Sequence, residues 1–174
     1  LFRSAVLFYT HKHVGIVLRI AHLWARNVIS ASPGSFRIAS RKVLPLGHGI
    51  DTDFFAPAKD APGIHDELRV VYAGRMAPAK HTHELFLGFA AGAEAKLVVH
   101  LDHFGDFIPR DAEYAKRAHE IAEPLVQKGV VTLHGGVDQV RILKGYQDAD
   151  CFINTTPAGS FDKAVLEGMA VGIP

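Results

Sequence analysis

The N-terminal part of the chain alternates short apolar runs with stretches of helical periodicity. Apolar runs bounded by turn residues are typical of strands, and apolar positions three and four residues apart are typical of helices. We predict strands at residues 5–9, 28–31 and 43–46, and helices at residues 14–26 and 33–39. Ser32 and Pro33 stand at the cap and the first position of the second helix, where both residue types are favoured.

The alternation stops between residues 47 and 66, where glycine, proline and aspartate recur. A polar, proline-containing stretch between two patterned regions is typical of a linker between domains. We therefore expect two domains, with residues 1–57 in the first, including the crossover, and residues 58–174 in the second.

The pattern then resumes with four further pairs of elements. The predicted strands are 68–73, 96–100, 130–133 and 151–154, and the predicted helices are 83–91, 111–126, 139–148 and 163–170. Continuous apolar strands that alternate with helices predict a parallel sheet covered on both faces, the doubly wound α/β fold. Ligands bind beyond the carboxyl ends of the strands in such sheets. The candidate loops lie at Gly74, Asp102, Gly135 and Pro157.

Composition removes several classes of function. The net charge is +1, and no basic stripe with interleaved aromatic residues suggests nucleic-acid binding. Cys151 is the only cysteine, so a disulfide framework or a cysteine-based zinc site is not expected, and a reducing compartment suits the chain. The eleven histidines lack the His-x-x-x-His spacing of zinc enzymes, and we expect no metal or other cofactor. The apolar run at residues 14–23 is too short to span a bilayer.

One carboxylate, Glu167, lies in a C-terminal segment that is otherwise mostly apolar or glycine. Burying an unpaired carboxylate is costly, so such a residue usually serves a buried pair or a ligand. Gly159 and Ser160 precede the helix, and a helix N-terminus favours an anionic or hydroxyl-rich ligand. The alternative is a loop and a buried helix with one satisfied glutamate.

A second candidate is the loop Gly74-Arg-Met-Ala-Pro-Ala-Lys80, which follows the strand at 68–73. It places Arg75 at the end of a strand and Lys80 just before a helix. Two cations at a strand-to-helix crevice suit a diphosphate, because arginine binds two oxygens as a fork and lysine adds a point charge. The alternative is a solvated loop with two surface cations. Neither Gly-x-Gly-x-x-Gly nor a Walker-type phosphate loop is present.

Several motifs in order along the chain resemble one family. They are Gly74-Arg-x4-Lys80, Gly136-Val137, Ala149-Asp150, Asn154-Thr-Thr-Pro157, Leu166-Glu-Gly-Met-Ala170 and Gly172-Ile-Pro174. Together they resemble the donor-binding domain of the family-four retaining glycosyltransferases, two-domain enzymes with the GT-B fold. The upstream segments at 30–37 and 47–51 resemble the end of the N-terminal, acceptor-binding domain and the crossover to the donor domain. The resemblance implies two Rossmann-like domains, both incomplete here, in what we expect to be a fragment.

The resemblance also implies roles for individual residues. Arg75 and Lys80 match the pair that binds the diphosphate of the sugar nucleotide and stabilises it as a leaving group. Glu167 matches the glutamate that accepts hydrogen bonds from the ribose hydroxyls, and the backbone of Val137 matches the contact to the base. Gly74 belongs to the donor-binding loop, and Ser160, Phe161 and Asp162 match the loop that faces the sugar and phosphate. His11 matches a histidine of the N-terminal domain beside the donor sugar.

One position departs from the family pattern. Gly159 stands where the family usually has its first glutamate, which contacts the transferred sugar, and Asp162 is the nearest carboxylate that could replace it. The implied activity is metal-independent transfer of a sugar from a UDP- or GDP-sugar to a hydroxyl of a glycan or lipid acceptor. A non-catalytic nucleotide-sugar-binding protein and a sugar-nucleotide epimerase remain alternatives. The implied location is the cytoplasm. Peripheral contact with the inner face of the membrane is a further alternative for the whole protein.

Overall fold

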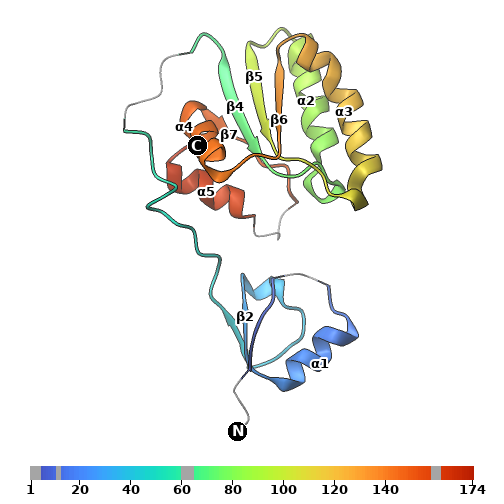
Figure 1. Cartoon of the computed structure of the whole chain (residues 1–174), viewed down its shortest axis with the longest axis vertical. Helices are drawn as coiled ribbons and strands as arrows, with labels where there is room; N and C mark the ends of the chain where they lie inside the picture. Colours follow the sequence, from blue (N-terminus) through green and yellow to red (C-terminus); the bar gives the residue numbers. More distant parts are fainter. Residues whose placement is uncertain (1–4, 11–12, 60–64, 158–161) are drawn as a thin grey trace. The chain divides into compact units, whose positions relative to one another are not determined.

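The computed structural model describes residues 5–10, 13–59, 65–157 and 162–174. These residues form two compact units (Figure 1). The first contains the described residues up to Gly49, and the second comprises Ile50–Pro157 with Asp162–Pro174.

The first unit is a three-stranded parallel sheet with one helix. Its elements are β1 (Ala5–Phe8), α1 (Ile16–Trp24), β2 (Ala25–Ser30), the 3-10 turn η1 (Pro33–Ser35) and β3 (Val43–Pro45), and the strand order is β1-β2-β3. Leu18 of α1 packs with Val28 and Phe36 in the core of this unit. The Nζ of Lys42 donates hydrogen bonds to the carbonyls of His22 (3.1 Å) and Ala25 (2.9 Å), which satisfies the C-terminal end of α1.

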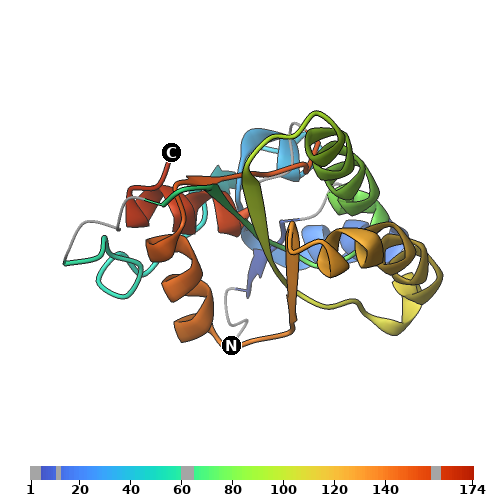
Figure 2. The ribbon, with the colours of Figure 1, turned by 90° about the horizontal axis from the view of Figure 1, so that it is seen from above.

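The second unit is a four-stranded parallel sheet with the strand order β6-β5-β4-β7. In chain order its elements are β4 (Leu68–Ala73), η2 (Pro78–Lys80), α2 (Thr82–Glu94), β5 (Val99–Phe104), η3 (Pro109–Asp111), α3 (Ala112–Gln127), β6 (Val131–Gly135), α4 (Gln139–Asp148), β7 (Cys151–Phe152) and α5 (Lys163–Val171). Helices α2 and α3 lie on one side of the sheet, and α4 and α5 on the other (Figures 1 and 2). The predicted doubly wound α/β arrangement is confirmed.

Two hydrophobic cores lie on the opposite faces of this sheet, and β4 contributes to both. Val70 and Tyr72 belong to the core beneath α2 and α3, whereas Val71 and Ala73 belong to the core beneath α4 and α5. Successive residues of a strand point to opposite faces, so a strand covered on both sides must be apolar throughout its buried part. This explains why the run 68–73 predicted a strand with its bounds correct.

The strand predicted at 96–100 was wrongly placed, because β5 begins at Val99 and continues to Phe104. Leu97 and Val98 are exposed, and Lys96 adopts a left-handed conformation (φ 60°) just beyond the end of α2. Asp102 therefore does not lie in a loop at a strand end, as expected, but pairs in register with Val71 and Thr132 inside the sheet. Three residues of this strand, His100, Asp102 and His103, are polar, so the apolar run that suggested it ends before the strand does.

Three other predictions need smaller corrections. The helix predicted at 14–26 ends at Trp24, because the chain enters β2 directly at Ala25, and the one predicted at 33–39 is a single 3-10 turn. The expected linker also contains an anchored turn. The Oδ1 of Asp51 accepts hydrogen bonds from the backbone N–H groups of Asp53 (3.2 Å) and Phe54 (3.0 Å), and Phe55 is buried in the core beneath α4 and α5 of the second unit. No helix among the described residues has the length and apolar character needed to cross a membrane.

Candidate functional site

The strand order of the second unit marks a place for a ligand. From β4 the chain moves outward through β5 to β6, and then returns to place β7 on the other side of β4. The order reverses between β4 and β7, and open α/β sheets bind ligands beyond the carboxyl ends of the strands at such a reversal. The loops that leave β4 and β7 therefore form the candidate site.

Glycines allow the loops after β4, β5 and β6 to approach one another closely. The N–H of Gly74 donates to the carbonyl of Phe104, and the N–H of Gly105 donates to the carbonyl of Gly135, both at 2.8 Å. Gly105 has φ +136°, and a side chain there would overlap the carbonyl of Gly74. Only glycine adopts this backbone at low cost, so the junction depends on it. The sequence pattern indicated loops at Gly74 and Gly135 but gave no sign of Gly105, because the strand before it was expected to end at residue 100.

The loop after β4 carries both predicted cations. Arg75 is half exposed, and its Nη1 lies 3.9 Å from Oδ2 of Asp111, whose side chain is 11% exposed. Lys80 ends the turn η2 and is followed by His81, which adopts a left-handed conformation (φ 49°) at the start of α2. The carbonyl of Lys80 accepts hydrogen bonds from the Thr155 hydroxyl (2.5 Å) and the Tyr72 hydroxyl (3.4 Å). The Thr155 bond ties the β4 loop to the loop after β7, and the Tyr72 bond ties it to β4.

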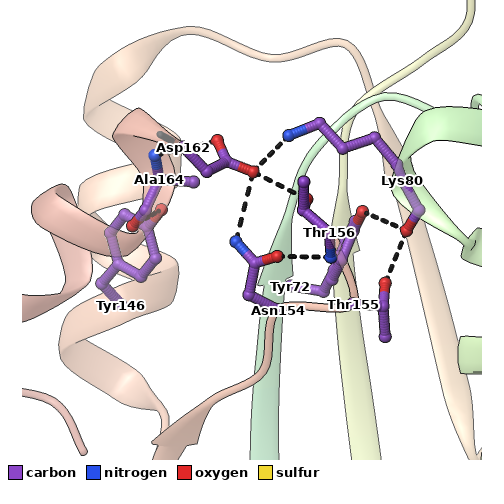
Figure 3. A network of polar contacts seen from close by, with 8 residues as sticks. All are labelled: Tyr72, Lys80, Tyr146, Asn154, Thr155, Thr156, Asp162 and Ala164. Atoms are coloured by element: carbon purple, nitrogen blue, oxygen red, sulfur yellow. Dashed lines mark hydrogen bonds and ion pairs between the residues drawn. The ribbon is translucent and has the colours of Figure 1, made fainter. Parts of the chain in front are cut away.

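The side chain of Lys80 reaches Asp162 and forms an ion pair with it (Figure 3). Oδ2 of Asp162 also accepts hydrogen bonds from Nδ2 of Asn154 (3.2 Å) and from Oγ1 of Thr156 (3.0 Å). Oδ1 accepts from the backbone N–H of Ala164 at 3.4 Å and thereby caps α5. The carboxylate is thus the point at which the loops after β4 and β7 meet the N-terminus of α5.

Burial and hydrogen bonding act in opposite directions on Asp162. Burial alone would raise the pKa of this carboxyl group, but the hydrogen bond and positive charge of Lys80, with the bonds from Asn154 and Thr156, outweigh it and lower the pKa. Asp162 is therefore ionised at neutral pH.

Glu167 lies on α5, five residues beyond Asp162, and is half buried. Burial raises its pKa, with a further contribution from the charge of Asp162, although Lys163 and the neighbouring Tyr146 side chain oppose the rise. The Tyr146 hydroxyl donates its one hydrogen to the carbonyl of Ala164 at 3.1 Å, and burial raises the pKa of this tyrosine. The carboxylate thus lies on the same helix as the Asp162 cap. The ribose contact implied for it stays a prediction.

The remaining predicted residues are less informative. Val137 follows β6, is half buried and packs against the core beneath α4 and α5. His11, Gly159, Ser160 and Phe161 lie outside the described residues. Among the residues that are described, no group of three or more histidine, cysteine or acidic side chains is arranged to hold a metal ion. His100 and His134 instead bond within the sheet, where Nε2 of His134 lies 2.6 Å from Oδ1 of Asp102.

Comparison with known proteins identifies the family. Residues 67–174 match the family described as "Glycosyl transferases group 1". The chain belongs to this family. The match covers β4 to α5, so it includes every described residue of the candidate site outlined above. No curated protein sequence matches the chain significantly.

Solved glycosyltransferase structures of the GT-B type share the fold. HepE from Anabaena, in complex with UDP and glucose, has a TM-score of 0.79 at 18% identity, over 99% of this chain and 52% of its own. TarM of S. aureus, in complex with fondaparinux, alpha-GlcNAc-glycerol and UDP, has a TM-score of 0.73 at 13% identity, over 98% of this chain and 36% of its own. The C-terminal domain of LpcC from Francisella tularensis has a TM-score of 0.58 at 20% identity, over 72% and 68%. The chain thus spans about half the length of HepE.

Proposed function

We propose that the whole protein is a family-four retaining glycosyltransferase that moves a sugar from a UDP- or GDP-sugar to a hydroxyl of a glycan or lipid acceptor. The observation that carries the proposal is the position of Arg75 and Lys80. Both lie on the loop that leaves β4 at the reversal of strand order, within the region that matches the group 1 family. HepE and TarM, which share the fold, were both solved with UDP bound.

In this proposal Arg75 and Lys80 bind the diphosphate and offset the charge that develops on it as it leaves. A preorganised cation is effective because it needs no reorganisation when charge appears. The bonds from Thr155 and Tyr72 to the Lys80 carbonyl supply such preorganisation. We propose that the two cations replace a metal ion in this role. The sugar is transferred by front-face substitution, with a phosphate oxygen of the leaving group helping to deprotonate the acceptor hydroxyl.

The proposed roles of the neighbouring residues follow the same arrangement. Glu167 accepts hydrogen bonds from the ribose hydroxyls, and the backbone of Val137 contacts the base. Glu167 lies on α5 and has a raised pKa, which supports a carboxylate that lies near the Asp162 network without being part of it. His11, Gly74 and residues 159–161 also belong to the proposed donor site. Residues 1–57 are the C-terminal part of the acceptor domain with the crossover, and residues 58–174 belong to the donor domain.

We further propose that the protein acts in the cytoplasm, in the synthesis of a polysaccharide or glycolipid, with peripheral contact at the inner membrane face. Support for this comes from the acceptor chemistry in the proposal and the single cysteine, which suits a reducing compartment.

The test is a transfer assay with the whole protein, labelled UDP- and GDP-sugars and a crude acceptor extract. Transfer supports the proposal, whereas epimer formation or binding alone would favour one of the two alternatives. Arg75→Ala and Lys80→Ala should each lower turnover at least about tenfold, which corresponds to about 1.4 kcal/mol of transition-state stabilisation. Arg117→Ala is the control, because Arg117 lies on the exposed surface of α3 in an ion pair with Glu113. Unchanged transfer in both loop variants would contradict the assignment.

A further inference from the structure

Each cation of the proposed diphosphate site already has a carboxylate partner. Lys80 pairs with Asp162, and Arg75 lies 3.9 Å from Asp111. The two pairs differ in kind. Arg75 is 50% exposed and its contact is long, so water and ligands compete for it easily. Lys80 and Asp162 are 20% and 14% exposed, and their contact is direct. The negative charge of Asp162 is therefore a fixed part of the site.

The network also fixes what Asp162 can do. Its Oδ2 accepts from Lys80, Asn154 and Thr156, and its Oδ1 accepts from the N–H of Ala164. Four donors from the protein therefore hold this carboxylate in place. It places a negative charge beside the ammonium group that binds the diphosphate.

That negative charge acts differently on the substrate and on the product. A nucleoside diphosphate sugar carries two negative charges. When the bond between the sugar carbon and the diphosphate oxygen breaks, the electron pair stays on the terminal phosphate, and the acceptor hydroxyl loses its proton to solvent through a phosphate oxygen. The free nucleoside diphosphate then carries about three negative charges, since the last phosphate pKa is about 6. A fixed carboxylate repels the product more strongly than the substrate.

We propose that Asp162 is a specificity-determining residue that makes the site discriminate against the free nucleoside diphosphate and in favour of the nucleotide sugar. This inference rests on the proposed role of Lys80 in binding the donor diphosphate. Discrimination of this kind limits product inhibition and speeds release of the spent nucleotide. Its cost is weaker stabilisation of the leaving group, because Lys80 is shared between Asp162 and the diphosphate.

The expected size follows from Coulomb's law. One additional unit charge about 7 Å from the carboxylate, at an effective dielectric constant of about 40, changes an equilibrium constant by about five- to tenfold. Removal of the Asp162 charge should therefore strengthen binding of a nucleoside diphosphate by about five- to tenfold more than it strengthens binding of the matching nucleotide sugar.

The test measures Kd by calorimetry for UDP, UDP-glucose, GDP and GDP-mannose with the whole protein and a set of variants. Asp162→Asn and Asp162→Ser remove the charge but keep an oxygen that caps α5. Asp162→Glu keeps the charge. Asp138→Asn is the matched control, since Asp138 caps the neighbouring helix α4 by accepting from the N–H of Arg141 at 2.8 Å. Thermal melts confirm that each variant is folded.

The two neutral variants should shift the ratio of the diphosphate and nucleotide-sugar Kd values by about five- to tenfold toward the diphosphate. The ratio should stay as in the unmodified protein for Asp162→Glu and Asp138→Asn. An unchanged ratio in folded Asp162→Asn and Asp162→Ser, or loss of all nucleotide binding in them, would overturn this inference and leave the proposed function standing. Failure of the unmodified protein to bind any of the four nucleotides would overturn the proposed function itself.

Discussion

The ion pair between Lys80 and Asp162 gives the sharpest prediction about stability. Lys80→Met removes the ammonium group and keeps the unbranched stem, so Asp162, whose side chain is 14% exposed, retains only neutral donors. Removing one partner of a buried pair costs about 3–5 kcal/mol. Asn154, Thr156 and the N–H of Ala164 remain bonded to the carboxylate, so we expect Lys80→Met to lower the free energy of unfolding by about 2 kcal/mol at pH 7.

The cost of Lys80→Met should depend on pH. The pKa of Asp162 is lower in the folded protein than in the unfolded chain, so its stabilising contribution is fully present above the unfolded value of about 4. The contribution disappears as the pH falls through the folded value, because the protonated acid no longer pairs with lysine. The difference between Lys80→Met and the unmodified protein should therefore shrink as the pH is lowered from 7 toward 3.

The assay is urea unfolding of the whole protein at several pH values. Lys144→Met is the matched control, because it removes an ion pair with Asp148 in which both side chains are about half exposed, 59% and 47%. Such a surface pair is worth less than about 1 kcal/mol. The reasoning is refuted if Lys80→Met costs no more than Lys144→Met. It is equally refuted if Lys80→Met costs as much in an Asp162→Asn background as in the unmodified protein, since no pair would then couple the two residues.

Two further predictions concern the core. Gly145→Ala should lower the free energy of unfolding by about 1–3 kcal/mol, because the added carbon would overlap the ring of Phe104. The control is Gly88→Ala, in a helix with open space around it, which should raise the free energy of unfolding by up to about 1 kcal/mol. If urea unfolding gives the same change for both variants, this account is contradicted. His103 is fully buried, and burial lowers its pKa to about 4, so stability should fall by about 2 kcal/mol between pH 7 and pH 5 as the unfolded histidine gains a proton that the folded one cannot. His103→Phe should remove that part of the pH dependence of the free energy of unfolding. An unchanged dependence in this variant would contradict the role given to His103.

The sequence predicted β4 better than β5 for a physical reason. Strands buried on both faces, such as β4, are continuous apolar runs, and the end of the run is the end of the strand. β5 lies between β4 and the edge strand β6 and carries polar residues such as Asp102, which bonds to His134 across the sheet. That partnership joins residues distant in sequence, so the pattern along the chain shows no sign of it.

In the candidate site, too, local features could be predicted from the sequence and contacts between distant residues could not. Arg75 and Lys80 were identified because a cation at each end of a strand-to-helix loop is a local pattern. The pairing of Lys80 with Asp162 joins residues 82 apart in sequence, and it depends on β7 lying next to β4. Sequence spacing identified Asp162 only as the carboxylate nearest to the missing sugar-binding glutamate, and its hydrogen bonds to the loops on either side could not be predicted from that spacing.

The most direct test of the proposed function is a crystal structure of the whole protein with bound UDP or GDP. The account predicts the diphosphate beyond the carboxyl ends of β4 and β7, with phosphate oxygens within about 3.5 Å of the Lys80 ammonium or the Arg75 guanidinium. A nucleotide bound elsewhere, or a diphosphate that contacts neither cation, would contradict it.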